Sequence, residues 1–160
     1  MAEQKTNVMR LLDQKKVAYR AHAYPHGDDA VDGVTVAGLI GKAPECVFKT
    51  LVARGASKSI YVFVIPVGGE LDLKHAAKAA KEKSVEMVHV GEINALTGYI
   101  RGGCSPIGMK KQYRTVIDAS ALYCDTIVVS AGKIGAQVEL SPQELIRLTR
   151  AETAALTKET

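Results

Sequence analysis

Two apolar runs separated by a short polar turn constrain the fold of this chain more than any other feature. The runs are residues 47–52 and 60–65, and the segment from Gly55 to Ser59 lies between them. Apolar runs of this length are typical of β-strands, and a short polar turn between two of them predicts a hairpin. The chain is therefore expected to build its core on a β-sheet.

A lysine interrupts the first of these strands. Because side chains alternate between the two faces of a strand, Lys49 shares one face with Val47, Leu51 and Ala53. Placing an ammonium group among hydrocarbon costs free energy unless the group reaches water, an anion or a carbonyl. We therefore expect a cleft at Lys49 rather than a sealed core.

Short helices and short strands alternate irregularly along the rest of the chain. Helices are expected after Thr6 and Thr35, which can cap them, over 73–81, and after Ser141, where a capping box has proline at the first helical position. A helical turn is expected over 92–96, and further strands over 85–90, 114–117, 126–129 and 137–140.

This order of elements predicts an α+β fold. Residues 1–160 are expected to form a single domain around one twisted sheet of mixed or antiparallel strands, flanked by short helices. A barrel-like closure of that sheet is one arrangement that the order allows. A chain of this length can bury a core without a metal ion or a disulfide as a staple.

Composition fits a soluble globular protein, with 47% hydrophobic and 24% charged residues. No run approaches the roughly 20 apolar residues that cross a bilayer, and residues 1–6 lack the apolar core of a signal peptide. The three cysteines, Cys46, Cys104 and Cys124, show no CxxC spacing. We expect a protein of the reducing cytoplasm with no membrane association.

The formal net charge of +4 matters only where basic residues cluster. Such clusters occur in three places: Lys15, Lys16 and Arg20; Lys74, Lys78, Lys81 and Lys83; and Lys110, Lys111 and Arg114 around Tyr113. Each could be a solvated face or could contact a polyanion. The third cluster directly follows a glycine-rich loop, and its interleaved tyrosine suits phosphates and a stacked base.

The glycine-rich loop, Gly102–Gly108, is the second candidate for a binding element. The pair Gly102-Gly103 leaves backbone N–H groups unshielded and permits positive φ, while Pro106 biases Ser105 toward an extended conformation. Such a loop can hold a carbonyl or phosphate oxygen, although an ordinary tight turn has the same composition. Together with Lys49, the loop indicates a small site.

Two other sets of residues offer alternative chemistry. Cys104 lies among backbone donors that would favour a thiolate nucleophile, but no base is near it in sequence. His22 and His26, with two aspartates after them, resemble a metal set, but the intervening proline and glycine argue against the helix that this spacing requires. We expect no metal and no cofactor.

Three segments in order resemble the YbaK/EbsC family: FKTLV at 48–52, LDLKHAAK at 71–78 and GYIRGGCSPIG at 98–108. The segment SAGK at 130–133 extends the likeness, which covers nearly the whole chain. Members of this family are aminoacyl-tRNA deacylases that typically remove cysteine from proline tRNA. The resemblance therefore implies trans-editing of Cys-tRNA(Pro), an error that arises because cysteine and proline are similar in volume.

The resemblance also assigns roles to residues. It implies that Lys49 holds the aminoacyl carbonyl or the terminal ribose and phosphate, and that Gly103 and Ser105 belong to a loop whose amides stabilise the oxyanion. The substrate thiol is thought to attack its own ester. The expected partners are the acceptor end of mischarged tRNA and prolyl-tRNA synthetase. The expected substrate-binding residues are Tyr24, Thr50, Gly102, Pro106 and Ser130, together with Lys110 and Lys111 of the basic cluster.

The sequence departs from the family pattern at three positions. Cys104 replaces a frequent aliphatic residue, Ala131 a frequent glycine, and Ile134 a common basic residue. These departures keep open a deacylase of Ala-tRNA(Pro) or of another small aminoacyl-tRNA. Two further alternatives are a non-catalytic tRNA-binding partner of the synthetase and a thiol hydrolase that uses Cys104.

Overall fold

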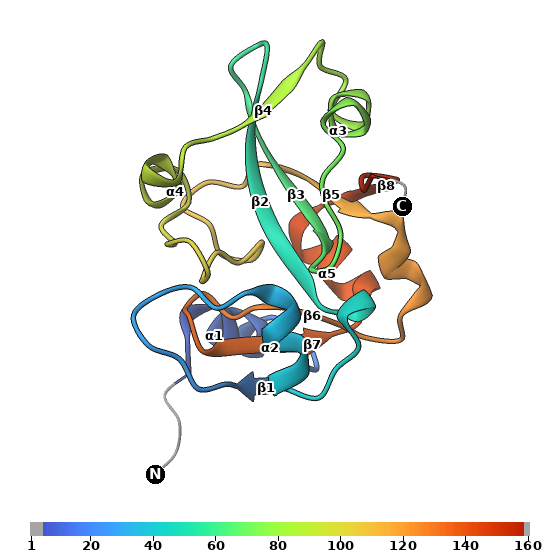
Figure 1. Cartoon of the computed structure of the whole chain (residues 1–160). Helices are drawn as coiled ribbons and strands as arrows, with labels where there is room; N and C mark the ends of the chain where they lie inside the picture. Colours follow the sequence, from blue (N-terminus) through green and yellow to red (C-terminus); the bar gives the residue numbers. More distant parts are fainter. Residues whose placement is uncertain (1–4, 159–160) are drawn as a thin grey trace.

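The computed structural model describes residues 5–158 as two β-sheets with helices packed on and between them (Figure 1). The larger sheet has five strands in the order β4-β2-β3-β5-β8, and the smaller has three in the order β1-β7-β6. The elements are α1 (Asn7–Gln14), β1 (Arg20–Ala23), α2 (Gly33–Leu39), η1 (Pro44–Cys46), β2 (Phe48–Gly55), β3 (Ile60–Pro66), α3 (Leu73–Ala80), β4 (Val85–Met87), α4 (Val90–Thr97), β5 (Arg114–Asp118), η2 (Ala119–Tyr123), β6 (Ile127–Ser130), β7 (Ala136–Leu140), α5 (Pro142–Thr149) and β8 (Glu152–Ala154).

The predicted hairpin is the centre of the larger sheet. β2 and β3 pair antiparallel from Phe48 opposite Pro66 to Arg54 opposite Ile60. β5 pairs with β3 in parallel, and β8 pairs with β5 in parallel, so the predicted mixed sheet is confirmed. β4 pairs with β2 only over Ala53–Gly55, and it therefore leaves the beginning of β2 uncovered.

The smaller sheet corrects the expectation of one sheet that could close as a barrel. β6 and β7 pair with each other and, through β7, with β1, where Arg20 lies opposite Glu139. Among the described residues, backbone pairing joins the two sheets at one isolated bridge, between Val47 and Val128. The described strands therefore do not close into a barrel. The sequence does not reveal β1 because this short strand is mostly exposed and lacks the apolar alternation of a half-buried strand.

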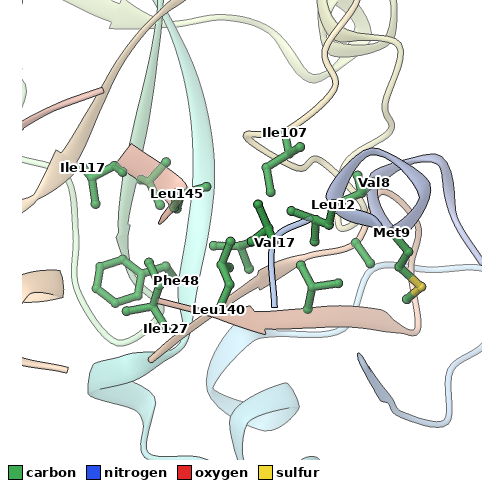
Figure 2. Packing of buried hydrophobic residues seen from close by; sticks show 14 of the residues in the cluster. Val8, Met9, Leu12, Val17, Phe48, Ile107, Ile117, Ile127, Leu140 and Leu145 are labelled. Atoms are coloured by element: carbon green, nitrogen blue, oxygen red, sulfur yellow. The ribbon is translucent and has the colours of Figure 1, made fainter. Parts of the chain in front are cut away.

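The main core lies between the two sheets. Val62 and Val64 of β3 point into it, together with side chains from β6, β7, α1 and α5. Figure 2 shows this packing, with Leu12 of α1 and Leu140 of β7 in the same apolar cluster. The alternate residues of β3, including Phe63, pack against α3 on the other face of the larger sheet. β3 is therefore buried on both faces.

Side-chain caps fix the starts of the helices. Thr6 Oγ1 accepts a hydrogen bond from Met9 N at 3.2 Å, and Ser141 Oγ accepts one from Glu144 N at 3.1 Å, as expected. The expected cap at Thr35 is wrong: Asp32 caps α2, because its carboxylate accepts from the amide of Thr35 at 3.2 Å. No helix in the described part of the chain is long and apolar enough to cross a membrane.

A disulfide joins Cys46 at the end of η1 to Cys124 after η2, with 6.0 Å between the two Cα atoms. The bond lies beside the bridge between Val47 and Val128 that connects the two sheets. This pairing differs from the reduced cysteines expected for a cytoplasmic protein. Nothing in the cysteine spacing predicts it, because 78 positions separate the two residues and only the tertiary fold brings them together.

Candidate active site

A cavity of about 510 Å³ opens between the two sheets, next to α2. We call it the first cavity. It brings together five of the residues expected at the site: Tyr24, Lys49, Thr50, Gly102 and Ser130. These residues come from the segment after β1, the beginning of β2, the glycine-rich loop and the end of β6. The cleft expected at Lys49 is therefore present.

Lys49 reaches this cavity because of its place in β2. Phe48 before it is buried in the core between the sheets, and Leu51 after it packs on the α3 side of the larger sheet. β4 does not cover this end of β2, so both Lys49 and Thr50 border the cavity although they point to opposite faces. Within residues 5–158, Lys49 takes part in no salt bridge, which leaves its ammonium group available to a ligand.

Thr50 also borders the first cavity. Its Oγ1 is buried and has no hydrogen-bond partner in the described part of the chain. An unpaired buried hydroxyl typically costs about 1–3 kcal/mol, so such groups are rare unless a ligand or water pairs with them. The hydroxyl group of Thr50 therefore lacks a hydrogen-bond partner from the described part of the protein.

The glycine-rich loop borders the first cavity through Gly102 and Cys104. Gly102 has φ of +86°, and a Cβ atom there would lie 2.6 Å from Cβ of Ala30, so the loop requires glycine at this position. Among the described residues, the amides of Gly102 and Cys104 have no backbone acceptor, whereas the amide of Gly103 donates to Ile100 O at 3.0 Å. The amides on either side of Gly103 are therefore free to donate to a ligand.

Gly103, Ser105 and Pro106 do not border the first cavity. A Cβ atom on Gly103 would lie 2.9 Å from Cα of Lys133, so this glycine packs against another backbone segment. Ser105 is fully buried, and its Oγ accepts a hydrogen bond from Ile107 N at 3.2 Å. Figure 2 shows Ile107 within the apolar core near α1. These residues hold the loop in place, and their predicted contact with the substrate stays a prediction.

Cys104 borders the first cavity as a neutral thiol. Burial raises its pKa to about 11, so the thiolate needed for nucleophilic attack is scarce at neutral pH. The alternative metal set does not assemble either. His22 Nε2 lies 2.7 Å from a carboxylate oxygen of Glu139, and no group of three or more potential metal ligands occurs within the described residues.

The first cavity also contains polar residues that sequence reasoning missed: Asp32, Arg101 and Gln137. Gln137 lies directly opposite Ser130 in the smaller sheet, and Arg101 immediately precedes the glycine pair. A glutamine inside an apolar strand is the same type of signal as Lys49 and could have been found. Asp32 lies in a segment rich in turn-forming residues, where an aspartate is ordinary.

The predicted basic cluster after the loop is partly structural. Lys110 and Lys111 border neither of the two cavities described here, and the Lys110 side chain lies along Gly98. The Arg114 guanidinium donates to Ala80 O at 2.8 Å at the end of α3, and Tyr113 Oη donates to Leu96 O at 2.7 Å. A role for Lys110 and Lys111 in contacting RNA therefore concerns phosphates outside these cavities and stays a prediction.

Comparison with known proteins agrees with this arrangement. Residues 28–148 match the family model described as the aminoacyl-tRNA editing domain. The chain belongs to this family. The resemblance seen in the sequence is thereby confirmed, because over 155 residues the chain is 46% identical to an Enterococcus faecalis protein named "Putative Cys-tRNA(Pro)/Cys-tRNA(Cys) deacylase EbsC", with 97% of this chain and 94% of that one covered.

Solved structures share the fold of this editing-domain protein. One is titled "Crystal structure of a putative trans-editing enzyme for prolyl tRNA synthetase", with a TM-score of 0.83 at 21% identity, covering 98% of this chain and 100% of that one. Another, of the hypothetical protein APE2540, has a TM-score of 0.83 at 24% identity and covers 94% and 99% of the two chains. The α+β architecture of this chain is therefore shared by these solved structures.

Proposed function

We propose that this editing-domain protein is a trans-editing deacylase that hydrolyses Cys-tRNA(Pro). The observation that carries the proposal is the first cavity, where an unpaired ammonium group, an unpaired hydroxyl and free backbone amides surround a space for a small ester. The family membership and the name of the Enterococcus faecalis relative support the same substrate class.

In this proposal the aminoacyl ester lies in the first cavity with its carbonyl oxygen near Lys49. The Lys49 ammonium group and the amides of Gly102 and Cys104 stabilise the negative charge that develops on that oxygen. Thr50 Oγ1 pairs with a polar group of the aminoacyl or ribose moiety. The protein therefore supplies positioning and charge stabilisation rather than a nucleophile of its own.

The substrate supplies the nucleophile. Its thiol sulfur attacks the carbonyl carbon of the same ester, forming a carbon–sulfur bond and breaking the carbon–oxygen bond to the ribose. The ribose oxygen leaves with the RNA and takes the proton that the thiol loses, and water then hydrolyses the thioester. Holding the two groups of one molecule in attack geometry removes much of the entropic barrier to this step.

The proposal includes partners and compartment. The acceptor end of mischarged tRNA is the substrate, and prolyl-tRNA synthetase is the enzyme that produces it. The cytoplasm is the compartment where both are present. Lys110 and Lys111, which lie outside the first cavity, contact phosphates of the acceptor stem in this proposal.

Replacement of Lys49 tests the assignment. We expect Lys49→Ala to lower kcat/KM for cysteinyl-tRNA(Pro) by about 100-fold or more, the usual cost of losing an oxyanion donor. Circular dichroism checks that the variant is folded. Lys58→Ala, which removes an exposed lysine of the turn between β2 and β3, outside both cavities and outside the three basic clusters, is the matched control. Unchanged turnover by Lys49→Ala would exclude the proposed role.

A second experiment tests the substrate. Rates for cysteinyl, alanyl, seryl and prolyl esters on the same tRNA should be highest for the cysteinyl ester, because only its thiol can attack. Equal rates for the alanyl or seryl ester would contradict attack by the substrate thiol and would support a broader deacylase. Binding of every tRNA with no ester cleavage would support the non-catalytic alternative.

A further inference from the structure

A second cavity adjoins the proposed site and has no role in the chemistry above. Its volume is about 600 Å³, and it lies between α4, the segment 28–30 and the beginning of the glycine-rich loop. Figure 1 shows α4 and the connection from β1 to α2 on the same side of the molecule. Ala30 and Arg101 line both cavities, so the two spaces are neighbours. A ligand that fills the first can continue into the second.

The size of each cavity suits a small ligand. Both volumes, about 510 and 600 Å³, fall in the range of small-molecule sites, roughly 300–1,000 Å³. An aminoacyl-tRNA is a chain of nucleotides that continues away from the esterified ribose, so anything that holds the ester next to Lys49 must give the preceding nucleotide a path. The second cavity provides such a path.

The walls of the second cavity combine apolar and acceptor groups. Val90 of α4 and Ile100 before the loop are 56% and 54% exposed, so their aliphatic side chains can make flat contact with a base. Asp28 and Asp29 bring carboxylates, and Asn94 has a free amide oxygen because its nitrogen donates to Tyr99 O at 3.4 Å. Away from Arg101, this wall therefore offers mainly hydrogen-bond acceptors.

The charged groups of this cavity are not used by the protein itself. Within residues 5–158, neither Asp28 nor Asp29 forms a salt bridge or accepts a side-chain hydrogen bond, and Arg101 pairs with no carboxylate. Arg101 lies where the two cavities meet, which is where a phosphate that links two nucleotides would pass. Asp28 and Asp29 line the second cavity but not the first. Their carboxylates would repel a phosphate there but would bind an amino group.

We infer that the second cavity binds the penultimate nucleotide of the tRNA 3′ end and reads its base as cytosine. This inference rests on the proposed function. The exocyclic amino group of cytosine donates to Asp28 or Asp29, a pairing that carboxylates make with this base, while Arg101 holds the linking phosphate. Uracil presents a carbonyl oxygen at the same position and is repelled by the carboxylates.

The test exchanges that one base. Cysteinyl minihelices ending in CCA or CUA are compared as substrates, and we expect kcat/KM to be about 5-fold or more lower for CUA. In the double variant Asp28→Asn/Asp29→Asn the difference should shrink or reverse, because an amide can donate to the carbonyl of uracil. Asp125→Asn, at an exposed residue outside both cavities, should keep the wild-type preference.

Two further measurements separate this inference from the proposed function. Equilibrium binding of the unacylated dinucleotides CpA and UpA requires no ester cleavage, and CpA should bind more tightly. Arg101→Ala should weaken both dinucleotides to a similar extent, because a phosphate contact carries no base identity. Equal binding of CpA and UpA by the wild-type protein, or a preference for cytosine that the double variant retains, would overturn the inference. Lack of deacylation with a retained CpA preference would instead overturn the proposed function alone.

Discussion

Two adjacent residues, Lys49 and Thr50, define the proposed site at the scale of single side chains. Sequence reasoning predicts Lys49, because a charge in an apolar strand stands out. The importance of Thr50 could not be derived in the same way, since a threonine is ordinary in a strand and only the fold shows that its hydroxyl lacks a partner. Gln137, like Lys49, is a polar residue within an apolar strand, so the same reasoning could have predicted it. Asp32 lies among turn-forming residues, where an aspartate is ordinary.

The substitution Thr50→Val tests whether the hydroxyl group contributes to substrate binding and whether it lowers the stability of the fold. We expect kcat/KM for cysteinyl-tRNA(Pro) to fall by about 10-fold, because a charge-free hydrogen bond of about 1.5 kcal/mol is lost. The melting temperature should stay the same or rise, since the variant no longer buries an unpaired hydroxyl. Thr153→Val, at an exposed position of β8, is the control. An unchanged kcat/KM would show that Thr50 does not contact the substrate.

Cys104→Ser tests the thiol-hydrolase alternative. Because burial raises the pKa of Cys104 to about 11, its thiol is protonated at neutral pH and we expect no covalent role. Deacylation of cysteinyl-tRNA(Pro) by the variant should remain within about 3-fold of wild type, as expected for a change in the cavity wall. A loss of activity larger than about 100-fold, together with inactivation of the wild type by alkylation, would favour Cys104 as the nucleophile.

At the scale of elements, the glycine-rich loop is held by contacts that its sequence does not show. Its glycines indicate a special backbone, but the reason for Gly103 is the backbone of the segment between β6 and β7, which passes beside it. The caps at Thr6 and Ser141 are local and were predicted, whereas α2 was expected to be capped by Thr35 and the structure uses Asp32. β8, a three-residue strand, carries too little pattern to be predicted.

Gly103→Ala should disrupt this contact. The new methyl group would lie 2.9 Å from Cα of Lys133 and 3.0 Å from N of Ile134, and a backbone cannot yield as a flexible side chain does. We expect a loss of about 1–3 kcal/mol in the free energy of unfolding, measured by chemical denaturation. Gly38→Ala in α2, where the methyl group would meet nothing within 4 Å, should be neutral or slightly stabilising. Equal stability of the two variants would contradict the close packing at Gly103.

At the scale of the whole molecule, Glu139 connects the smaller sheet to its surroundings. Its carboxylate lies near His22 Nε2 at 2.7 Å and Lys42 Nζ at 3.1 Å and accepts a hydrogen bond from Thr126. Burial alone would raise the pKa of Glu139, but the hydrogen bonds from these three side chains outweigh it and hold the pKa at about 2. The folded protein therefore retains this carboxylate in its charged form in mild acid.

This pKa predicts how stability changes with pH. A carboxylate with a lower pKa when folded stabilises the fold above its unfolded value near 4.5, and the contribution is lost as the pH falls from there toward 2. The free energy of unfolding is expected to fall by up to about 3 kcal/mol over this pH range. Chemical denaturation of the wild type, measured at several pH values from 7 to 2, should show this decrease. In Glu139→Gln this part of the pH dependence should disappear. If the free energy of unfolding changed with pH in the same way in both proteins, the lowered pKa of Glu139 would be contradicted.

The division into two sheets marks the limit of what the sequence predicts. The hairpin of β2 and β3 is local, so its apolar runs and polar turn specify it. The pairing of β1 with β7, and the disulfide between Cys46 and Cys124, join segments far apart in the chain. No local pattern carries information about such partners, and one sheet was therefore expected where the structure has two.

The pairing of β1 with β7 has a consequence for the newly synthesised protein. While the ribosome is still translating residues before Ala136, β1 has no partner, and Gln137 is missing from the wall of the first cavity. The early hairpin can fold from local contacts, but the closing of the smaller sheet requires β7 to have been translated. A nascent chain is therefore expected to be inactive until β7 has emerged from the exit tunnel.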